Sequence, residues 1–598
     1  MIQASFKRYQ WVSGLLILVG LIIFIWLVRI QTSEGAKEFR DGMKRRFEIY
    51  SDTVRSNRGS IYDRWGNPLA TNREVYEVGV DLRYIADKDI PVLVQTLSQA
   101  LGWDAAKVKK EISRKYDPKV DPYGYYVFLS GFVPSENVAV IKEKRKQLYQ
   151  EWEAAPNRKK GSIPSLFAIV YQPKLIRTYP EGSLGSNILG LYLYAQEKPV
   201  GYLGVEEYYN DLLSGITVNQ VKTTNPYNTT VTDVPPGADL ILTIDRDVQA
   251  MIEKVLDNAV ARTGATAGVI VVLDPRNGEI LGMASSGRVD LNNYGNLSKD
   301  AIAPANFNRA ISRTYEPGSV FKVLTMASGL DSGAVRPDSV YQDTGRNVVG
   351  GITIYNWDRI GHGPQTMQGC LQLSLNTCLS WVAQQIKPTR FFEYLNRFGI
   401  GRPSNIDLAG EVIYPLSTVD GNRIPDSNLG TNAFGQGVSV NVAQMVMAVS
   451  ALANDGKMFA PHVLKSYVDN GRQITPQPKL VDRPISAETA RTITELLARS
   501  LENESSKALV EGYRVAGKTG TAEIAGPGGY LSNATNASFV GWGPVDNPRF
   551  LVYVWLEKPT TSPWGSIVAS PVFKEVTEKL VILLDIPPDA QRQKLASQ

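Results

Sequence analysis

The sequence predicts an α+β multidomain protein that carries a single N-terminal transmembrane helix. Its 598 residues exceed the length of an ordinary single domain. Residues 11–28 contain no charged side chain, and strand-like and helix-like patterns are mixed over the rest of the chain. The hydrophobic content of 43% and the charged content of 21% are typical of a globular protein. The net charge of +5 is small for this length and gives no reason to expect nucleic-acid binding.

Residues 11–28 are expected to form a membrane anchor. A helix of this length extends over about 27 Å, which is close to the thickness of the hydrocarbon core. The run is longer than the apolar part of a usual signal peptide, and no clear small-residue cleavage site follows it. We therefore expect a short cytoplasmic segment at 1–10 and an uncleaved anchor at 11–30. The alternative is a buried helix of a soluble protein.

The region after the anchor divides at a polar stretch. Residues 57–70 have the pattern strand, turn, strand, and residues 90–101 and 105–113 have the pattern of amphipathic helices. A Thr- and Asn-rich stretch over 217–237 ends in Pro-Pro-Gly, and residues 240–245 then read as a strand. We expect a non-catalytic pedestal domain at 31–237, a catalytic domain at 238–587 and a disordered tail at 588–598.

A Ser-x-x-Lys motif supplies a candidate nucleophile and its base. After Pro317-Gly318, the run from Ser319 to Leu330 reads as an apolar helix. Residues three apart on a helix share a face, so the Lys322 amine can reach the Ser319 hydroxyl. If burial lowers the pKa of Lys322, the amine can remove the proton of the hydroxyl. The unpaired backbone N–H groups at the start of the helix can help to stabilise an oxyanion.

A second motif, Ser374-Leu375-Asn376, adds a relay and an amide. Ser374 suits a relay that returns the proton to the leaving amine, and Asn376 can hydrogen-bond an amide of a bound peptide. Ser-x-Asn also occurs at 135–137 and at 439–441. The first of these lies far upstream, but the second lies between the other two motifs, so order alone does not exclude it.

The third motif, Lys518-Thr519-Gly520-Thr521, lies in an alternating run that is typical of a strand. Lys518 and Thr519 offer a cation and a hydroxyl to a substrate carboxylate. The strand would aim the N–H of Thr521 at the same oxyanion as the N–H of Ser319. Ser-x-x-Lys, Ser-x-Asn and Lys-Thr-Gly in this order are the pattern of a serine acyltransferase.

The scarcity of histidine supports this scheme. His362 and His462 are the only histidines, so a Ser-His-Asp site or a metal site built on histidine has few candidates. We expect neither a metal nor a cofactor. His362 either helps to shape the cleft or occupies a plain turn.

Cys370 and Cys378 would lie about 12 Å apart on a continuous helix, too far for a disulfide, so we expect free thiols.

The chain resembles the class B penicillin-binding proteins over almost its full length. The segment 58–64 (Arg-Gly-Ser-Ile-Tyr-Asp-Arg) is similar to the first pedestal motif of that family. Arg177–Gly182 is similar to the second motif, and Gly204-Val205-Glu206 to the third. Val272–Ile280 and Phe434–Gly437 are similar to segments that flank the active site of the family.

The resemblance implies a D,D-transpeptidase that cross-links peptidoglycan stem peptides and is a target of β-lactams. It also implies an elongated α/β pedestal and a β-lactamase-like transpeptidase domain, with an antiparallel sheet between helical layers. It favours Ser374 over Ser439 for the middle motif. The bulky Leu375 stands at the variable position of that motif. The residues that match the three active-site motifs are Ser319, Lys322, Ser374, Asn376, Lys518 and Gly520.

The resemblance further implies a location and a partner. The protein would cross the bacterial inner membrane once, with its catalytic domain outside the cytoplasm. It would work with a polytopic membrane glycosyltransferase of the SEDS type, in cell elongation or in division. Six basic residues at 29–46, against Lys7 and Arg8 before the anchor, favour the opposite orientation. Long domains cross membranes largely regardless of such charges, so the active-site argument decides.

Three other classes share part of this pattern. A β-lactamase has the same motifs but needs neither an anchor nor a long preceding domain. A membrane-anchored β-lactam sensor needs a cytoplasmic signalling part, which residues 1–10 are too short to supply. A bifunctional class A enzyme needs a glycosyltransferase domain with motifs that contain histidine, and no histidine precedes residue 240. A transpeptidase is the preferred reading, with a sensor or a non-catalytic scaffold of the wall-synthesis complex as the alternative.

Overall fold

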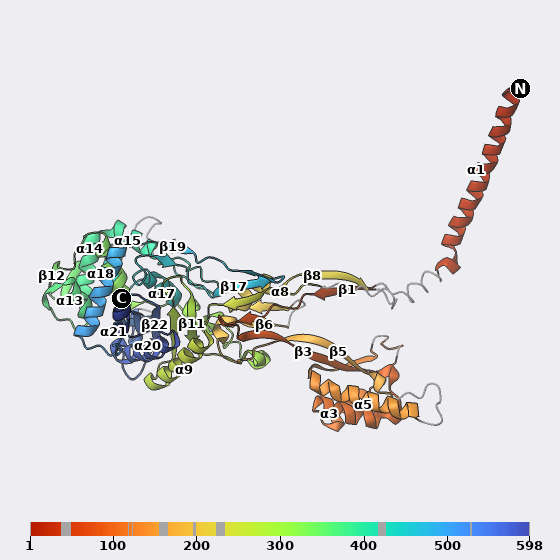
Figure 1. Ribbon diagram of the computed structural model, residues 1–598, viewed down its shortest axis with the longest axis horizontal. Coiled ribbons are helices and arrows are strands. Elements are labelled where there is room, and N and C mark those ends of the chain that lie inside the picture. Colours follow the sequence, from red (N-terminus) through yellow and green to blue (C-terminus); the bar gives the residue numbers. More distant parts are fainter. Residues whose placement is uncertain are drawn as a thin grey trace. The chain divides into compact units, whose positions relative to one another are not determined.

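Figure 1 shows the computed structural model. By its internal contacts the chain divides into two compact units. Unit 1 comprises residues 1–58 and 214–237, and unit 2 comprises residues 59–213 and 238–598. The segment 31–237, which we expected to be one pedestal domain, therefore contributes to both units. The structure describes residues 2–37, 50–117, 119–121, 124–154, 165–194, 199–222, 234–416, 426–526 and 529–596.

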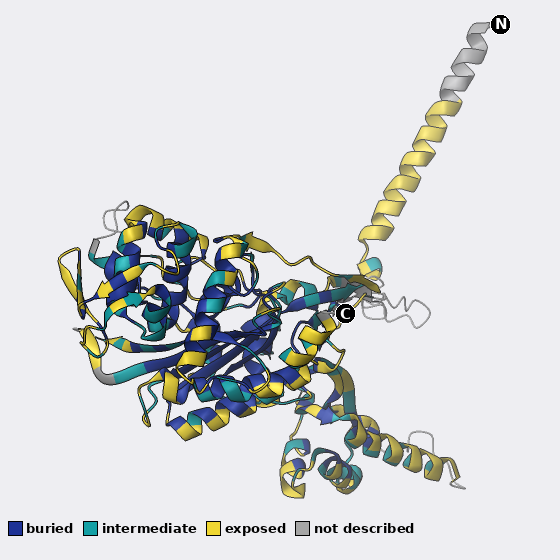
Figure 2. Cartoon of the chain, turned by 60° about the vertical axis from the view of Figure 1, so that its left-hand side comes forward, coloured by how far each residue is buried: buried dark blue, intermediate teal, exposed yellow. Residues whose placement is uncertain are grey.

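Unit 1 contains a long apolar helix and a pair of strands. The helix α1 (Ile2–Thr32) includes a stretch, Val12–Thr32, with a mean hydropathy of 2.5 that is long and apolar enough to cross a membrane. The residues of this stretch are exposed, as their yellow colour in Figure 2 shows. This is expected for a helix whose apolar surface faces lipid. In the same unit, β1 (Tyr50–Arg55) pairs antiparallel with β8 (Thr217–Lys222).

The first part of unit 2 is a sheet with its own helical layer. The predicted strand–turn–strand is confirmed as β2 (Ile61–Tyr62) and the start of β3 (Pro68–Asp81). The strand β3 pairs antiparallel with β4 and β5. The two predicted helices are confirmed as α3 and α4, and α3 packs on α5. The bounds of the other elements are β4 (Tyr126–Pro134), β5 (Ile169–Thr178), α3 (Ile90–Leu101), α4 (Ala105–Ile112) and α5 (Ser135–Ala154).

The helices α3, α4 and α5 cover only one face of this sheet. Alternate residues of a strand point to opposite faces, and Val78 and Val80 of β3 point toward Leu93 and Leu97 of α3 in one buried cluster. The sheet continues in the order β18-β17-β9-β2-β3-β4. Its remaining strands are β9 (Asp239–Leu242), β17 (Leu464–Asp469) and β18 (Arg472–Ile474).

The second part of unit 2 is built on a five-stranded antiparallel sheet in the order β11-β10-β22-β21-β20. All seven residues of β10 are buried, because helices cover both faces of the sheet. The strands are β10 (Ala267–Leu273), β11 (Ile280–Ser285), β20 (Ala516–Gly526), β21 (Gly529–Gly543) and β22 (Phe550–Glu557).

One face of this sheet packs against α9 (Arg246–Thr263) and α20 (Ser570–Leu583), since Ile270 and Val272 share a core cluster with residues of both helices. Val269 and Val271 point the other way, into a cluster that contains residues of α12 and α17. The predicted antiparallel sheet between helical layers is therefore confirmed. In Figure 2 its strands form the buried centre of this part.

Short elements complete unit 2. The two-stranded sheets are β6 (Leu191–Leu193) with β7 (Val200–Tyr202), β12 (Val340–Asp343) with β15 (Gly363–Thr366), β13 (Arg346–Val349) with β14 (Ile352–Tyr355), and β16 (Met458–Phe459) with β19 (Leu480–Asp482). The remaining helices outside the site are α6 (Ser186–Leu189), α7 (Gly204–Tyr208), α8 (Asn210–Ser214), α10 (Pro304–Phe307), α11 (Arg309–Ser312), α15 (Pro388–Arg397), α16 (Asp426–Asn432), α17 (Val442–Ser450), α18 (Ala487–Asn503) and α19 (Gly565–Val568).

Residues 589–596 of the C-terminal segment are helical, whereas we expected a disordered tail at 588–598. They form the helix α21 (Asp589–Ala596). The carboxylate of Asp589 accepts a hydrogen bond from the backbone N–H of Arg514 at 2.7 Å. Arg592 forms ion pairs with Asp589 and Asp546. These polar contacts hold the helix in place. Its sequence has little apolar surface, and this composition suggested disorder.

Candidate active site

The Ser-x-x-Lys motif lies at the start of a helix, as predicted. A 3₁₀ turn, η5 (Gly318–Phe321), runs directly into α12 (Lys322–Asp331). Gly318 has a φ of +58°, a conformation that glycine adopts without steric cost. Ser319 is partly exposed, whereas Lys322 is fully buried. The hydroxyl therefore borders solvent while the amine lies in the interior.

The Lys322 amine lies against the middle motif. Its Nζ donates a hydrogen bond to the carbonyl oxygen of Ser374 at 2.6 Å and lies 3.1 Å from Ser374 Oγ. Burial lowers the pKa of Lys322 well below its ordinary value, and the positive charge of Lys518 lowers it further. A lysine in such surroundings can act as a base at moderate pH, because desolvation disfavours its charged form.

Ser374 occupies the turn between α13 (Met367–Gln372) and α14 (Asn376–Ile386). Of the three Ser-x-Asn sequences, the structure places this one beside Lys322. The sequence at 439–441 has another task, because Asn441 caps the helix α17 through a capping box with Gln444. The sequence at 135–137 lies in α5, in the first part of unit 2.

Cys370 and Cys378 form a disulfide, so the expectation of free thiols is wrong. Their α-carbons lie 6.0 Å apart, well below the distance expected on one continuous helix. The helix is in fact broken. The helix α13 ends at Gln372 and α14 begins at Asn376, and the turn between them brings the two cysteines together.

A buried polar cluster holds the start of α14. The side-chain amide of Asn376 donates to the carbonyl of Tyr355 at 3.1 Å. The next residue, Thr377, has its hydroxyl 2.9 Å from the Asp343 carboxylate and 2.8 Å from the Asn356 side-chain oxygen. The amide of Asn356 donates to Asp343 at 2.7 Å. No sequence motif signalled this cluster, because its members are far apart along the chain.

His362 belongs to a turn near the same cluster. Its backbone N–H donates to Asp343 Oδ2 at 3.0 Å, and its ring Nε2 lies 2.9 Å from Asp358 Oδ2. These contacts fix the segment between β14 and β15. Of the two roles left open for His362, the turn role accounts for these bonds.

Two exposed tryptophans flank the site. The rings of Trp357 and Trp564 contact edge to face, with their centroids 5.5 Å apart. The indole N–H of Trp357 donates to the carbonyl of Leu373, next to Ser374. Trp564 precedes Gly565, whose N–H donates to Thr521 Oγ1 at 3.1 Å. The two tryptophans thus connect the surroundings of the second motif with those of the third. No pattern in the sequence indicated this contact.

The third motif lies on β20, at the edge of the five-stranded sheet, and passes close to η5. A Cβ on Gly520 would lie 2.8 Å from Val320 Cγ1, and a Cβ on Gly318 would lie 2.8 Å from the carbonyl oxygen of Thr521. Both positions therefore need glycine for this close approach. The contact brings the first and third motifs together, as the sequence predicted.

Lys518 is buried beside the first two motifs. The residue is 6% exposed, and its Nζ lies 3.3 Å from Thr519 Oγ1. Burial lowers the pKa of Lys518 to about 8, against the opposing effect of the Glu504 carboxylate, which raises it. The positive charge of Lys518 contributes to the lowered pKa of Lys322. A charged Lys518 therefore favours the neutral form of Lys322.

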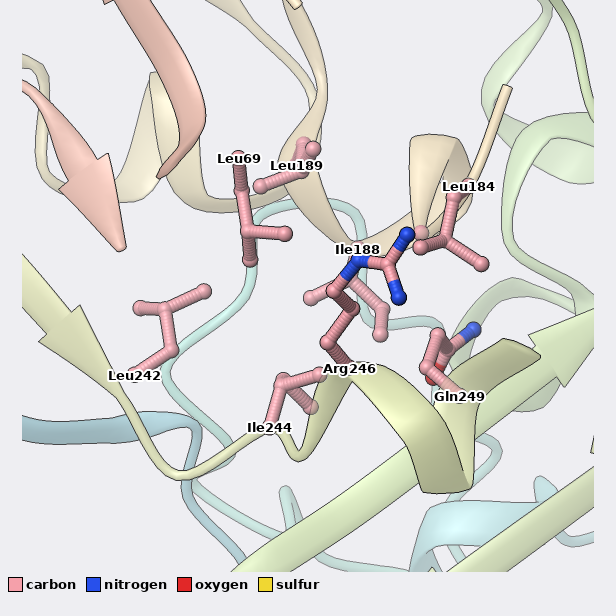
Figure 3. A pocket seen from close by; sticks show the side chains of 9 residues that line it. Leu69, Leu184, Ile188, Leu189, Leu242, Ile244, Arg246 and Gln249 are labelled. Atoms are coloured by element: carbon pink, nitrogen blue, oxygen red, sulfur yellow. The ribbon is translucent and has the colours of Figure 1, made fainter. Parts of the chain in front are cut away.

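The described residues contain no cluster of three or more His, Cys, Asp or Glu side chains that could hold a metal ion. A small pocket elsewhere in unit 2 is lined mainly by aliphatic side chains, with Arg246 and Gln249 beside them (Figure 3). Its interior of about 10 Å³ has room for about one water molecule. None of the motif residues lines this pocket, so it is not the candidate site.

Comparisons with known proteins agree with this architecture. The family model described as the penicillin binding protein transpeptidase domain matches residues 268–578, and that of the penicillin-binding protein dimerisation domain matches residues 53–242. The chain is 32% identical to stage V sporulation protein D of Bacillus subtilis, over 96% of this chain and 85% of that protein. It is 30% identical to the probable peptidoglycan D,D-transpeptidase PbpC of Pseudomonas aeruginosa, over 97% and 96% of the two chains.

Solved structures show the same fold. A peptidoglycan synthetase from Bifidobacterium adolescentis is 27% identical, with a TM-score of 0.67 over 90% of this chain and 97% of that one. Penicillin binding protein 2X from Streptococcus thermophilus is 21% identical, with a TM-score of 0.74 over 89% and 80% of the two chains. The fold and the matched domains define a penicillin-binding protein. The chain belongs to the class B members of that family.

Proposed function

We propose that this protein is a peptidoglycan D,D-transpeptidase that cross-links stem peptides through an acyl-enzyme on Ser319, and that it is a target of β-lactams. Membership of the class B penicillin-binding proteins supports this activity. The observation that carries the proposal is the buried amine of Lys322, which lies 3.1 Å from Ser374 Oγ and belongs to the helical turn that follows Ser319. The cross-links would serve cell elongation or division.

The reaction begins with proton transfer. The neutral amine of Lys322 takes the proton of Ser319, and Oγ attacks the carbonyl carbon of the D-Ala-D-Ala amide. The C–N bond then breaks, and Ser374 relays a proton to the departing nitrogen of D-alanine. An acceptor amine on a neighbouring stem peptide attacks the ester, forms the new amide and releases Ser319 with its proton restored.

The remaining motif residues bind the peptide. Lys518 and Thr519 hold the terminal carboxylate of the donor, as a cation and a hydroxyl. Asn376 bonds a backbone amide of the peptide. The N–H groups of Ser319 and Thr521 form the oxyanion hole. The loss of one such donor usually costs about 10²–10³ in rate. The glycine at 520 lets β20 approach η5 closely enough for both donors to reach one oxygen.

The same proposal includes a location and a partner. Residues 11–30 anchor the protein once in the bacterial inner membrane, with residues 1–10 in the cytoplasm. Residues 31–237 form the non-catalytic pedestal and residues 238–587 the transpeptidase domain, outside the cytoplasm. The apolar stretch Val12–Thr32 supports the anchor. The pedestal holds none of the three motifs, and it docks a polytopic membrane glycosyltransferase of the SEDS type that supplies the glycan strands.

Acylation by penicillin tests the nucleophile. Intact-mass analysis of the protein after penicillin treatment should show one added acyl group, which peptide mapping places on Ser319. The variant Ser319→Ala should gain no mass, because it lacks the nucleophile. Ser439→Ala is the matched control and should be acylated at close to the wild-type rate. An adduct on Ser319→Ala, or on a different residue of the wild type, would refute the assignment.

A further inference from the structure

The Cys370–Cys378 disulfide closes a ring of chain around Ser374. Its two cysteines are eight residues apart and are the only cysteines in the sequence. Cys370 lies in α13 and Cys378 in α14, so the bond ties the two helices together on either side of the turn. Both side chains are completely buried. The ring encloses the middle motif and no other candidate site residues.

The turn inside this ring has an unusual backbone conformation. Ser374 has a φ of +53°, in the left-handed region that residues other than glycine rarely adopt. Two backbone bonds support it, from Ser374 N–H to the Leu371 carbonyl at 3.2 Å and from Leu375 N–H to the Cys370 carbonyl at 3.0 Å. Such a conformation persists only where the surrounding structure holds it in place.

This conformation decides where the Ser374 carbonyl points. In the structure the carbonyl accepts the 2.6 Å hydrogen bond from Lys322 Nζ, and the hydroxyl of Ser374 lies 3.1 Å from the same nitrogen. If Ser374 relaxed to a negative φ, its peptide plane would rotate. The carbonyl and the hydroxyl would then no longer meet the amine together.

We propose that the Cys370–Cys378 disulfide positions Ser374 against Lys322 for the acylation step. The inference rests on the proposed function, because it assigns the bond a task in the reaction of Ser319 with the acyl donor. The cysteines touch no reacting atom. They act through the turn, by restricting it to the one conformation in which the relay hydroxyl and the base are adjacent.

The disulfide should affect the chemical step more than ligand binding. Asn376 is held separately, through its bond to the Tyr355 carbonyl and through the contacts of Thr377 with Asp343 and Asn356. Lys518 lies on β20, outside the ring. The groups proposed to bind the donor therefore keep their supports when the ring opens, and mainly the relation of Ser374 to Lys322 changes.

A double-mutant cycle on the full-length protein separates positioning from packing. We would measure the penicillin dissociation constant and the maximal acylation rate for Cys370→Ala, Cys378→Ala and the double variant. Each single change already opens the ring, so all three variants should lose about tenfold or more in rate, with the dissociation constant within about twofold. If the bond contributed only buried volume, the variants would be less stable but would keep acylation rates close to that of the wild type.

Reduction of the unchanged protein gives a measurement that does not depend on variant folding. Protein treated with a phosphine reductant, with both thiols verified by alkylation and mass, should acylate as slowly as the double variant. The same reductant should not alter the double variant, since the chain has no other cysteine. Equal acylation rates in oxidised and reduced protein, or faster acylation after reduction, would overturn the positioning role. If oxidised wild-type protein is not acylated at all, the proposed function itself fails.

Discussion

At the scale of single residues, the candidate site contains two buried lysines to which the proposed reaction assigns opposite proton states. Lys322 must be neutral to accept a proton from Ser319, and Lys518 must be charged to attract a carboxylate. Burial lowers the pKa of both, and the charge of Lys518 lowers the pKa of Lys322 further. The Glu504 carboxylate raises the pKa of Lys518 and so opposes the effect of burial. The position of Glu504 thus helps to keep one lysine charged while the other is neutral.

This arrangement predicts a pH limit for substrate capture. A lysine loses its charge as the pH rises through its pKa, and the pKa of Lys518 is about 8. The acylation efficiency of the free enzyme, measured as rate over dissociation constant for penicillin, should therefore fall as the pH rises above about 8. The efficiency should also fall at low pH, where Lys322 becomes protonated and can no longer act as the base.

The variant Glu504→Gln tests the cause of the upper limit. Without the carboxylate that raises the pKa of Lys518, the fall in efficiency should begin at a lower pH. Glu502→Gln is a control on the same segment, since Glu502 pairs with Arg514. Its pH profile should match that of the wild type. An unchanged profile in Glu504→Gln would mean that this carboxylate does not tune Lys518.

The sequence was informative about site residues that belong to short motifs, and less so about the residues that support them. Ser319, Lys322 and Lys518 were predicted because fixed spacing on a helix or a strand has a direct geometric meaning. The contacts of Thr377 with Asp343 were not predicted. They depend on how the segment from Asp343 to Asn356 packs against α14, and no local pattern of residues predicts that packing.

At the scale of elements, the most informative difference between sequence and structure is the break between α13 and α14. The expectation of free thiols assumed one continuous helix between Cys370 and Cys378, which would keep the two cysteines apart. Apolar periodicity indicates which face of a helix is buried. It does not reveal a single residue with a left-handed backbone conformation, such as Ser374 with a φ of +53°. The prediction of free thiols failed for this reason.

The polar cluster at the start of α14 gives an element-scale prediction. Thr377→Val keeps the shape of the side chain but removes the hydroxyl that contacts Asp343 and Asn356. The buried carboxylate and amide lose a partner, which costs about 1–3 kcal/mol. Because α14 carries Asn376, we expect weaker penicillin binding, measured as a higher dissociation constant, together with a lower melting temperature.

A buried threonine outside the three motifs serves as the control. Thr494 on α18 donates its hydroxyl to the carbonyl of Leu452. Thr494→Val should lower the melting temperature and leave the penicillin dissociation constant unchanged. If both variants weaken binding equally, the effect reflects general destabilisation and not the support of Asn376.

At the scale of the whole molecule, part of the chain before residue 237 shares a buried core with the part that follows it. Ile61, Leu69 and Leu203, all upstream of residue 237, belong to the same buried cluster as Val269 on β10 of the catalytic part. The helical layer formed by α3, α4 and α5 has a separate cluster. One region of the pedestal therefore shares its core with the transpeptidase domain, and another has a core of its own.

The three pedestal motifs meet in the shared region. Arg177, from the second motif, pairs with Glu206, from the third, at 2.7 Å, with side chains 1% and 0% exposed. Arg177 also donates to the carbonyl of Gly59, in the first motif, at 2.7 Å. These residues serve the fold of their own chain. The resemblance identified the three motifs, but only the structure shows that they form one buried ion-pair cluster.

The last prediction tests whether this cluster stabilises the catalytic part. Glu206→Gln leaves the Arg177 charge buried without its partner, a loss of about 3–5 kcal/mol in similar cases. Because the surrounding core is shared, we expect a lower temperature at which the protein loses its ability to be acylated by fluorescent penicillin. Leu97→Ala in the separate core of α3 should cost about 2–5 kcal/mol there, detected by limited proteolysis, without lowering that temperature. If Leu97→Ala lowers the temperature as much as Glu206→Gln does, the two cores unfold together and the pedestal stabilises the catalytic part as one body.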